Sequence, residues 1–416
     1  MLKNIVISNF KSINDEVELS FEAVESDNLN EYYLTNDNLL KLALIYGANA
    51  SGKTNIIKAV GFLREFILIP PENKEEKIDI TPFKFSDNIN KNSKFKLEFI
   101  ENGKLFVYEI ELNYKEVVKE SLKYKDLSLK KPRFALVFER NLKEISYGNK
   151  IKITKTQKEI LNLNTLPNNA LLSGYLKVNL DIDELNSTIN FFKRILPPIF
   201  PTTDLLGFVL KKMENQEIDK DEILKILKSA DFAIDDFDIE EKELDEDFLD
   251  FIKKIDENKD LSNLKKIEIW FKHFKKYKLE FKEESRGTQR FYQLAAVLIL
   301  LIKNSYIVLI DEIESSLHPD LLKFFLLIFL SNSKNSQLIL TTHTRELLLE
   351  KDILRNDVIW FCEKDKNGAT ELFSLSDFGS EIRKDSSIYN FYKYGKLGAV
   401  PNIKNFLGLF DEKKKS

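Results

Sequence analysis

Gly47-Ala48-Asn49-Ala50-Ser51-Gly52-Lys53-Thr54 is the most informative stretch of this 416-residue chain. It follows the apolar run 41–46 (KLALIY) and precedes a stretch whose apolar residues have helical spacing, to about residue 68. GxxxxGK[ST] between a strand and a helix predicts a loop whose backbone N–H groups surround phosphate. Lys53 would reach the β- and γ-phosphates, and the Thr54 hydroxyl would bind Mg²⁺. The sequence therefore predicts an ATP and Mg²⁺ site with contacts from Gly47, Asn49, Ser51, Gly52, Lys53, Thr54 and Asn55.

A second motif, residues 306–312 (YIVLIDE), is an apolar strand that ends in two carboxylates. In a P-loop protein, Asp311 would hold Mg²⁺ and Glu312 would orient and polarise the attacking water. The alternative is an ordinary strand whose carboxylates cap the next helix. The complete phosphate loop upstream favours the catalytic interpretation.

Two further features depend on their context. His343 directly follows the apolar strand 337–342 (QLILTT), where it could contact a γ-phosphate or be a structural histidine. Ser285, Gly287 and Thr288 open a predicted helix at 288–303, where they could bind phosphate at the helix N-terminus. Ser285 or Thr288 could instead be an ordinary N-cap.

The order of these motifs resembles the ABC-type ATPase heads of the SMC, RecF and OLD families. The opening residues 1–14 (MLKNIVISNFKSIN) are similar to the start of those heads, where an N-F-[KR]-[SC] turn follows the first strand. The resemblance implies a P-loop NTPase fold of α/β class, with an antiparallel β subdomain and an inserted helical region. It also implies that Ser285, Gly287 and Thr288 form a signature motif that acts on nucleotide held by a second subunit, in at least a dimer. Residues 313–318 would be the D-loop, and His343 the switch histidine.

Other segments narrow the resemblance to the AAA-type ATP-binding proteins typified by RloA. They are 81–85 (TPFKF), 311–319 (DEIESSLHP), 337–344 (QLILTTHT), 355–378 and 394–403 (YGKLGAVPNI). That resemblance implies a switch in prokaryotic defence or mobile-element loci, which gates a separate effector protein. A RecF-like ATPase acting on DNA is the alternative, so a nucleic-acid partner stays open. The D-x-D pair of an OLD-type TOPRIM nuclease is absent after His343, so we expect no nuclease in this chain.

Two positions depart from the family pattern. Residue 50 is alanine where many SMC-type loops have glycine, which is tolerated if its φ is negative. No glutamine can be assigned to the Q-loop of the family.

The chain is expected to fold in three parts. Residues 1–152 would form the N-terminal half of the ATPase head, 153–265 a mostly helical insertion, and 266–416 the C-terminal half. Residues 231–260 hold 14 acidic and 4 basic residues, which favours a solvated helical face with a loop. Lysines and aromatic residues alternate at 265–282. This pattern is found in hairpins that face DNA, but we favour an amphipathic strand pair whose lysines face solvent.

Composition limits the class of protein. The net charge of −4 gives no overall attraction to nucleic acid. A lone cysteine, Cys362, cannot form an internal disulfide, and with three histidines it leaves too few ligands for a cysteine-based zinc cage. The longest apolar stretch, near 294–302, is far shorter than the ~20 residues that span a bilayer, and the N-terminus has no signal-peptide pattern. We therefore expect a cytoplasmic protein without a membrane partner.

Overall fold

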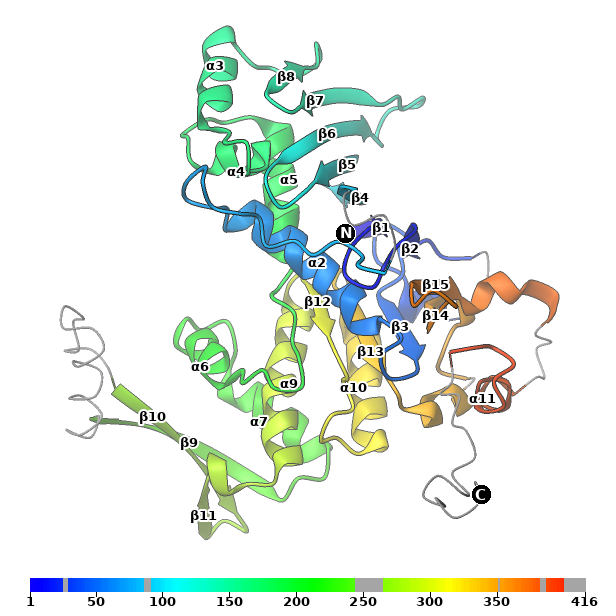
Figure 1. The fold of residues 1–416 in the computed structure, drawn as a ribbon. Helices are drawn as coiled ribbons and strands as arrows, with labels where there is room; N and C mark the ends of the chain where they lie inside the picture. The colour runs from blue at the N-terminus through cyan, green and yellow to red at the C-terminus, as the bar shows by residue number, and fades with distance from the viewer. Residues whose placement is uncertain (25–28, 86–90, 244–264, 351, 382–386, 400–416) are drawn as a thin grey trace, which may run out of the picture. The chain divides into compact units, whose positions relative to one another are not determined.

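A computed structural model describes residues 1–24, 29–85, 91–243, 265–350, 352–381 and 387–399. The chain forms two compact units (Figure 1). Unit 1 comprises Met1–Pro201, Ser305–Ile313 and Lys334–Ser416, and unit 2 comprises Thr202–Asn304 and Glu314–Ser333. Each unit is described by itself.

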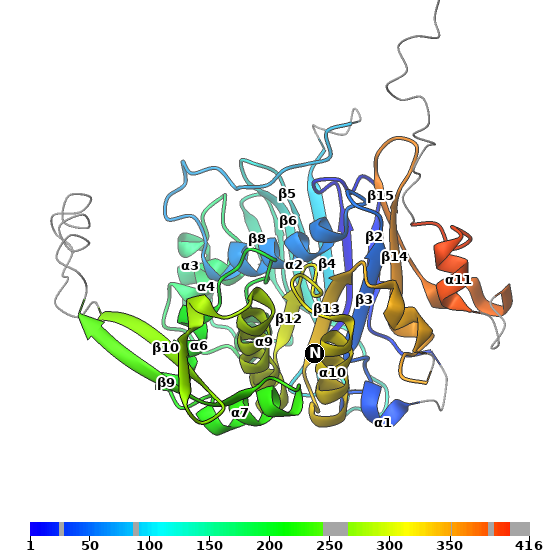
Figure 2. The ribbon, with the colours of Figure 1, turned by 90° about the horizontal axis from the view of Figure 1, so that it is seen from below.

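A five-stranded sheet forms the centre of unit 1. Its order is β12 (Ile307–Ile310), β13 (Gln337–Thr342), β3 (Leu42–Gly47), β14 (Ile359–Lys364) and β15 (Thr370–Ser374), as Figure 2 shows. The first four strands are parallel, and β15 pairs antiparallel with β14. All residues of β12, β13 and β3 are buried, which explains their continuous apolar sequences. Strands from the C-terminal half of the sequence thus flank β3 on both sides, and the carboxyl end of β3 leads into the phosphate loop.

A seven-stranded antiparallel sheet forms the second layer of unit 1. Its order is β2 (Val17–Ser20), β1 (Leu2–Ser8), β4 (Ser93–Glu101), β5 (Lys104–Leu112), β6 (Val117–Asp126), β7 (Ala135–Asn141) and β8 (Glu144–Tyr147). Side chains alternate between a buried and a more exposed face, as in β4. Helix α5 (Asp183–Arg194) packs on the buried face, where the rings of Phe191 and Phe99 stack with centroids 3.9 Å apart (Figure 1).

A buried ion pair lies on that face of the seven-stranded sheet. The Glu120 carboxylate lies 3.6 Å from the Arg140 guanidinium, and both side chains are buried. Glu120 also accepts hydrogen bonds from the backbone N–H of Leu171 and the hydroxyl of Tyr108, and Arg140 donates to the Asn169 carbonyl. These bonds satisfy charges that would otherwise be costly to bury, and they join β6 and β7 to the segment before α4.

The remaining helices of unit 1 are short, except for the one that follows the phosphate loop. They are α1 (Asn30–Tyr33), α2 (Lys53–Leu68), α3 (Lys155–Asn164), α4 (Leu171–Leu176) and α11 (Ile388–Lys393), with 3-10 helices η3 (Arg345–Leu349), η4 (Asn356–Val358) and η5 (Leu375–Glu381). Helix α2 buries one face, including Ile56, Val60 and Leu63, against β3, β13, α4 and α5. Residues Arg345–Leu349, which follow β13 and His343, form the 3-10 helix η3.

Unit 2 combines helices with a three-stranded sheet. The helices are α6 (Leu206–Glu214), α7 (Lys220–Ser229), α9 (Arg286–Lys303) and α10 (Pro319–Asn332), with η2 (Phe281–Glu283). The sheet order is β11 (Tyr277–Glu280), β10 (Lys265–His273) and β9 (Ile234–Glu243). The rings of Phe237 and Phe271 pack against Tyr292 of α9, so one face of the sheet is anchored to this helix.

Strand β9 corrects the sequence interpretation of the acidic run. The structure has a strand at Ile234–Glu243 where the charge pattern favours a helical face with a loop, and residues 244–260 of the run lie outside the described residues. The error arose because the count of charges was given more weight than the alternation of Asp236, Phe237, Asp238 and Ile239, which is present in the sequence and has the period of a strand.

The polar face of the three-stranded sheet carries paired charges. The Lys272 ammonium of β10 lies 3.2 Å from the Asp236 carboxylate and 2.9 Å from that of Asp238, and the Lys278 ammonium of β11 lies 3.1 Å from Asp238. Because aspartates neutralise these lysines, the hairpin fits an amphipathic strand pair better than a DNA-facing one.

No helix among the described residues combines the length and the apolar character needed to cross a membrane.

Candidate functional site

The phosphate loop is formed where β3 ends and α2 begins, and both of its glycines are required by close contacts. A Cβ on Gly47 would lie 2.3 Å from the Cys362 carbonyl oxygen of β14. Gly52 has φ +112°, and a Cβ there would lie 2.0 Å from the Thr370 hydroxyl of β15. Strands β14 and β15 thus hold the loop in a conformation that other residues could not adopt.

The N-terminus of α2 is open. Its N-cap residue is Gly52, so no side chain caps the first turn of the helix. The buried Ser51 hydroxyl likewise has no hydrogen-bond partner among the described residues. Uncapped N–H groups and an unpartnered hydroxyl fit an anionic ligand such as a triphosphate, which the helix dipole also favours.

Lys53 and His343 meet at this loop. The buried Lys53 ammonium donates to the carbonyl oxygens of Gly47 (2.9 Å) and Ala48 (3.1 Å). It also lies 3.2 Å from Nε2 of His343, which follows β13. A phosphate group bound at the loop would therefore meet the lysine and the histidine together.

Thr54 and Asp311, the two residues predicted to bind metal, lie within hydrogen-bond distance of each other. The Thr54 hydroxyl donates to Oδ2 of Asp311 at 2.9 Å, and Asp311 is buried at the end of β12. The described residues contain no cluster of three or more histidine, cysteine or acidic side chains, so a cage made entirely of protein ligands is absent from that part of the chain. One carboxylate and one hydroxyl suit Mg²⁺, which keeps several waters and takes its other ligands from phosphate.

Thr341 contacts both acidic residues, and no motif in the sequence points to this role. Its hydroxyl donates to Oδ1 of Asp311 at 2.5 Å and accepts from the backbone N–H of Glu312 at 2.8 Å. Glu312 itself is exposed and has φ +46°, an unfavourable conformation for a residue with a side chain. The bond from Thr341 helps to hold this strained backbone, which places the Glu312 carboxylate at the mouth of the pocket.

Ala50 does not meet the condition under which alanine would be tolerated at this position, a negative φ. Its φ is +64°, so the loop has the left-handed backbone that glycine adopts in many related loops. The methyl group costs about 1–2 kcal/mol in this conformation. The geometry of the loop is therefore maintained here at the expense of local strain.

A pocket of about 340 Å³ surrounds the loop and brings most of the predicted loop residues together with Glu312 and His343, although Gly47 and Asp311 do not line it. Its lining comprises Ser12, Asn49, Ala50, Ser51, Gly52, Lys53, Thr54, Asn55, Glu312, His343 and Lys364. The sequence did not identify Ser12 or Lys364 as part of this site. Ser12 belongs to the N-F-K-S turn, and its hydroxyl accepts from the Asn55 amide at 2.6 Å and lies 2.6 Å from the Thr370 hydroxyl.

The predicted signature residues lie in unit 2, at the N-terminus of α9. Ser285 is the N-cap, and its hydroxyl accepts from the backbone N–H of Thr288 at 3.1 Å. A Cβ on Gly287 would lie 3.0 Å from the Ser316 carbonyl oxygen, so the predicted D-loop passes close to this glycine. The structure therefore assigns a capping role to Ser285, while its action on nucleotide stays a prediction.

A segment before unit 2 runs beside β12. Ile195 and Ile199 form parallel bridges with Ile307 and Ile310, and the Asp311 N–H donates to the Ile199 carbonyl at 2.8 Å. Phe200, Pro201 and Thr202 follow, with no glutamine among them. The position of a Q-loop glutamine therefore stays open.

Cys362 lies directly behind the loop. Its thiol lies 3.5 Å from the Ser51 carbonyl oxygen, and burial raises its pKa to about 11. At neutral pH the thiol is therefore protonated, as expected for a small core residue.

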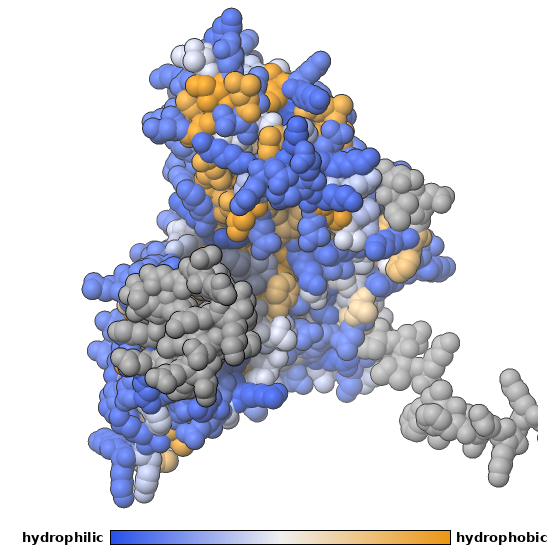
Figure 3. All heavy atoms as spheres, turned by 60° about the vertical axis from the view of Figure 1, so that its left-hand side comes forward, coloured by the Kyte–Doolittle hydropathy of each residue, from blue (hydrophilic) through white to orange (hydrophobic). Residues whose placement is uncertain are grey.

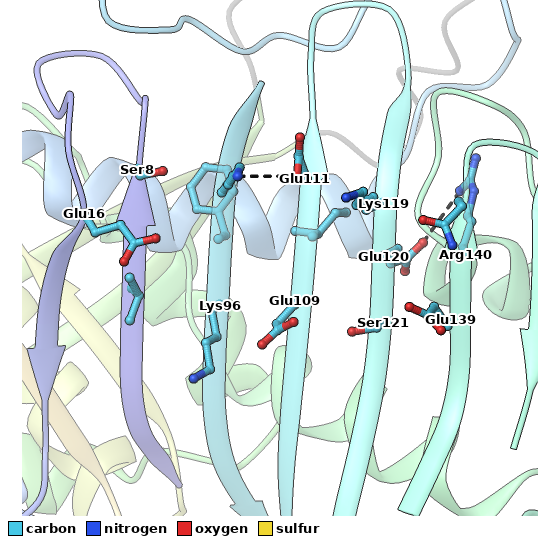
Figure 4. Close-up of a pocket in the computed structure, with 15 residues that line it drawn as sticks. Ser8, Glu16, Lys96, Glu109, Glu111, Lys119, Glu120, Ser121, Glu139 and Arg140 are labelled. Atoms are coloured by element: carbon cyan, nitrogen blue, oxygen red, sulfur yellow. Dashed lines mark ion pairs between the residues drawn. The ribbon is translucent and has the colours of Figure 1, made fainter. Parts of the chain in front are cut away.

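A second pocket, of about 390 Å³, lies on the exposed face of the seven-stranded sheet (Figure 4). Its labelled side chains come from neighbouring strands and have both charges, with Glu109, Glu139 and Lys96 among them. No glycine-containing turn or helix N-terminus contributes to its lining. The loop pocket is therefore the better candidate for a phosphate ligand.

A family described as "AAA domain, putative AbiEii toxin, Type IV TA system" matches residues 42–350, about three quarters of the chain. The chain belongs to this AAA domain family. The match contains the phosphate loop, Asp311, Glu312 and His343. Together with the phosphate loop between β3 and α2, membership defines the fold as a P-loop NTPase of α/β class.

Solved SMC heads are also similar to the chain. The SMC head domain from Thermotoga maritima has 16% identity and a TM-score of 0.41, over 90% of this chain and 98% of that one. An Smc head bound to the C-winged helix domain of ScpA has 17% identity and a TM-score of 0.43, over 90% and 97%. An Smc head from Pyrococcus furiosus has 14% identity and a TM-score of 0.40, over 95% and 98%. No curated protein matches the chain.

Proposed function

We propose that this AAA domain protein is an ATP-binding and ATP-hydrolysing switch that gates a separate effector. The observation that carries the proposal is the convergence of Lys53, Asp311, Glu312 and His343 around one uncapped helix N-terminus. Phosphate-binding groups alone would suit a nucleotide-binding scaffold. The exposed carboxylate of Glu312 beside them adds a group that can act on water.

The residues divide the chemistry among themselves. Mg²⁺, when bound by Thr54 and Asp311, would neutralise charge on the phosphates. Lys53 and the first-turn N–H groups of α2 would bind the β- and γ-phosphates, and His343 would contact the γ-phosphate through its position beside Lys53. Glu312 would accept a proton from the attacking water, and Thr341 would keep its backbone in place.

Ser285, Gly287 and Thr288 are proposed to complete the site of a second copy of the chain. The proposal is supported by their position at a helix N-terminus, which is an anion-binding element of the fold. ATP would then lie between two copies, and its hydrolysis would separate them. A switch of this kind can transmit its nucleotide state to another protein because the two states differ in assembly.

A role in prokaryotic defence, of the RloA type, is the cellular context we propose. The family description names a toxin of a toxin–antitoxin system, which supports this context over a housekeeping one. The effector contact is proposed to involve the region 153–260. Its first helices carry exposed apolar side chains, with Leu163 of α3 82% exposed and Leu176 of α4 40% exposed. Figure 3 shows apolar residues gathered on the part of unit 1 that carries these helices.

A RecF-like role on DNA is the second candidate. The net charge of −4 and the pairing of Lys272 and Lys278 with aspartates argue against an extensive DNA surface on the described residues. We therefore favour a protein effector as the main partner, in the cytoplasm.

Phosphate release by the purified chain with ATP and Mg²⁺ tests the proposal, with Lys53→Ala as the variant that should lose both binding and turnover. Plasmid DNA and tRNA in the same reactions test whether the chain cuts nucleic acid. We expect phosphate release without cleavage. Absence of ATP binding by the wild type would contradict the proposed function, and cleavage that persists in Glu312→Gln would reveal a nuclease.

A further inference from the structure

Lys364 is the last residue of β14 and lies beside the phosphate loop. In the parallel pairing of β14 with β3, Cys362 is opposite Gly47, so Lys364 extends beyond the point where β3 ends. It is the one residue of β14 that lines the loop pocket, across which the loop itself and His343 lie.

The face of the strand places the Lys364 side chain toward the loop. Side chains alternate along a strand, so Lys364 shares a face with Cys362, and its cross-strand partner Thr370 lies on that face too. Both neighbours contact the same atom, the Ser51 carbonyl oxygen, at 3.5 Å from the Cys362 thiol and 2.9 Å from the Thr370 hydroxyl. Lys364 is the next side chain in this row.

The turn after Lys364 is well fixed. The Asp365 carboxylate accepts from the backbone N–H groups of Asn367 (2.8 Å) and Ala369 (2.7 Å), and the Asp365 N–H donates to the Ala369 carbonyl. The hairpin therefore presents Lys364 from a rigid backbone, so little backbone entropy is lost when its ammonium binds a ligand.

The Lys364 ammonium has no carboxylate partner among the described residues. Lys364 is exposed and forms no ion pair with any carboxylate in that part of the chain. Both adjacent carboxylates have other partners: Glu363 lies on the opposite face of the strand and accepts from the Ala399 N–H at 2.8 Å, and Asp365 accepts from the N–H groups of its own turn. A cation that lines a phosphate pocket, with its neighbouring acids bound elsewhere, is suited to an anionic ligand.

We propose that Lys364 is a second cationic contact for the polyphosphate of the bound nucleotide, on the side of the loop opposite to the Mg²⁺ ligands. The sheet order supports this side, because β13 and β12 carry His343 and Asp311 on one flank of β3, while β14 carries Lys364 on the other. The contact would then be made to the α- and β-phosphates, away from the bond that is broken. The inference rests on the proposed ATP site.

A contact of this kind predicts a change in binding without a change in turnover. Lys364→Ala should weaken Mg²⁺-dependent binding of ATP and of ADP by the same factor, about tenfold, and should raise KM while kcat is retained. The loss should be larger at low ionic strength, because the pocket is open to solvent. Lys364→Arg should keep most of the affinity.

Calorimetric titration of the full chain with ATP and with ADP tests the inference. Lys366→Ala is the matched control. This substitution removes the same charge from an exposed lysine of the same turn, and Lys366 does not line the pocket. Equal melting temperatures of the variants would exclude a folding defect. If Lys53→Ala loses nucleotide binding but Lys364→Ala keeps wild-type affinity, or loses affinity for ATP alone, the inference is overturned and the proposed function is not. A wild type that binds neither nucleotide would overturn the proposed function, and this inference with it.

Discussion

The N-termini of α2 and α9 carry the two motifs that the ATPase families place around one nucleotide, but their local chemistry differs. At α2, Gly52 offers no cap, so the first turn of the helix has no side-chain acceptor. At α9, Ser285 is a cap whose hydroxyl accepts from the Thr288 N–H. The first helix needs an external anion to satisfy its donors, while the second has an acceptor within its own chain.

This difference indicates how the two motifs contribute. The α2 end, with Lys53, can bind a phosphate within one chain. The N-terminus of α9 is capped without a ligand. This property suits a site that contacts nucleotide only when a second subunit brings it. We therefore expect binding to depend on the α2 end alone and turnover to depend on both.

The largest effect is expected at Glu312, which belongs to the α2 site. Glu312→Gln should reduce turnover by about 10²–10⁴-fold, because the amide cannot accept the proton of the attacking water. ATP affinity should be retained, since Lys53 and the loop are intact, and the ATP-bound assembly should accumulate. Phosphate release and ATP titration of the same preparation measure both quantities. Turnover at the wild-type rate would show that Glu312 is not the base.

The uncapped N-terminus of α2 should make unit 1 strongly responsive to ligand. At a concentration one hundred times Kd, ATP with Mg²⁺ should stabilise the folded state by about 2.7 kcal/mol. Thermal denaturation of Glu312→Gln, which avoids hydrolysis during the scan, measures the shift, with Lys53→Ala as the control without response. An unchanged melting temperature in Glu312→Gln would contradict an anion site at α2.

Removal of the N-cap of α9 should destabilise the protein even when no nucleotide is bound. Ser285→Ala removes the acceptor of the Thr288 N–H and should reduce the free energy of unfolding by about 1 kcal/mol. Ser285→Thr, which keeps a hydroxyl, should be close to wild type. Denaturant unfolding in the absence of nucleotide measures the difference, and equal stability of Ser285→Ala and wild type would show that the cap is energetically unimportant.

The smallest effect concerns the strain in the phosphate loop. Ala50→Gly removes a left-handed alanine, worth about 1–2 kcal/mol, but adds the backbone entropy of glycine, about 0.5–1 kcal/mol. A net gain in stability of about 0.5–1 kcal/mol should result, with ATP binding unchanged. A decrease in the free energy of unfolding would show that Ala50 does not have the left-handed conformation.

Much of the site could be predicted because its motifs are continuous in sequence and follow buried strands. GANASGKT, YIVLIDE and the strand before His343 each combine an apolar run with polar residues at its carboxyl end, so their meeting at one sheet edge could be expected. Thr341 and Lys364 could not be found in this way. Their roles depend on the lateral order of β12, β13, β3 and β14, which a single sequence does not reveal.

The errors have physical causes as well. Strand β9 was missed because a dense acidic run was interpreted by its charge. Phe237 and Ile239 alternate with aspartates in the sequence, but the strand that pairs with them, β10, is about 30 residues away and the sequence does not identify it. The left-handed φ of Ala50 could not be read from the sequence, because alanine usually avoids this region. The close contacts of Gly47 with β14 and of Gly52 with β15 determine the backbone path of the loop, even though Ala50 is strained in it.

Mixing two inactive variants tests most directly whether the two helix ends act in different copies of the chain. Ser285→Arg keeps an intact loop and should bind ATP without turnover, while Lys53→Ala keeps an intact α9 end and should not bind. A mixed assembly would contain one complete site, so phosphate release should reappear on mixing and light scattering should show ATP-dependent assembly. Full activity of Ser285→Arg by itself, or an active wild type that remains a monomer with ATP at every concentration, would contradict the account.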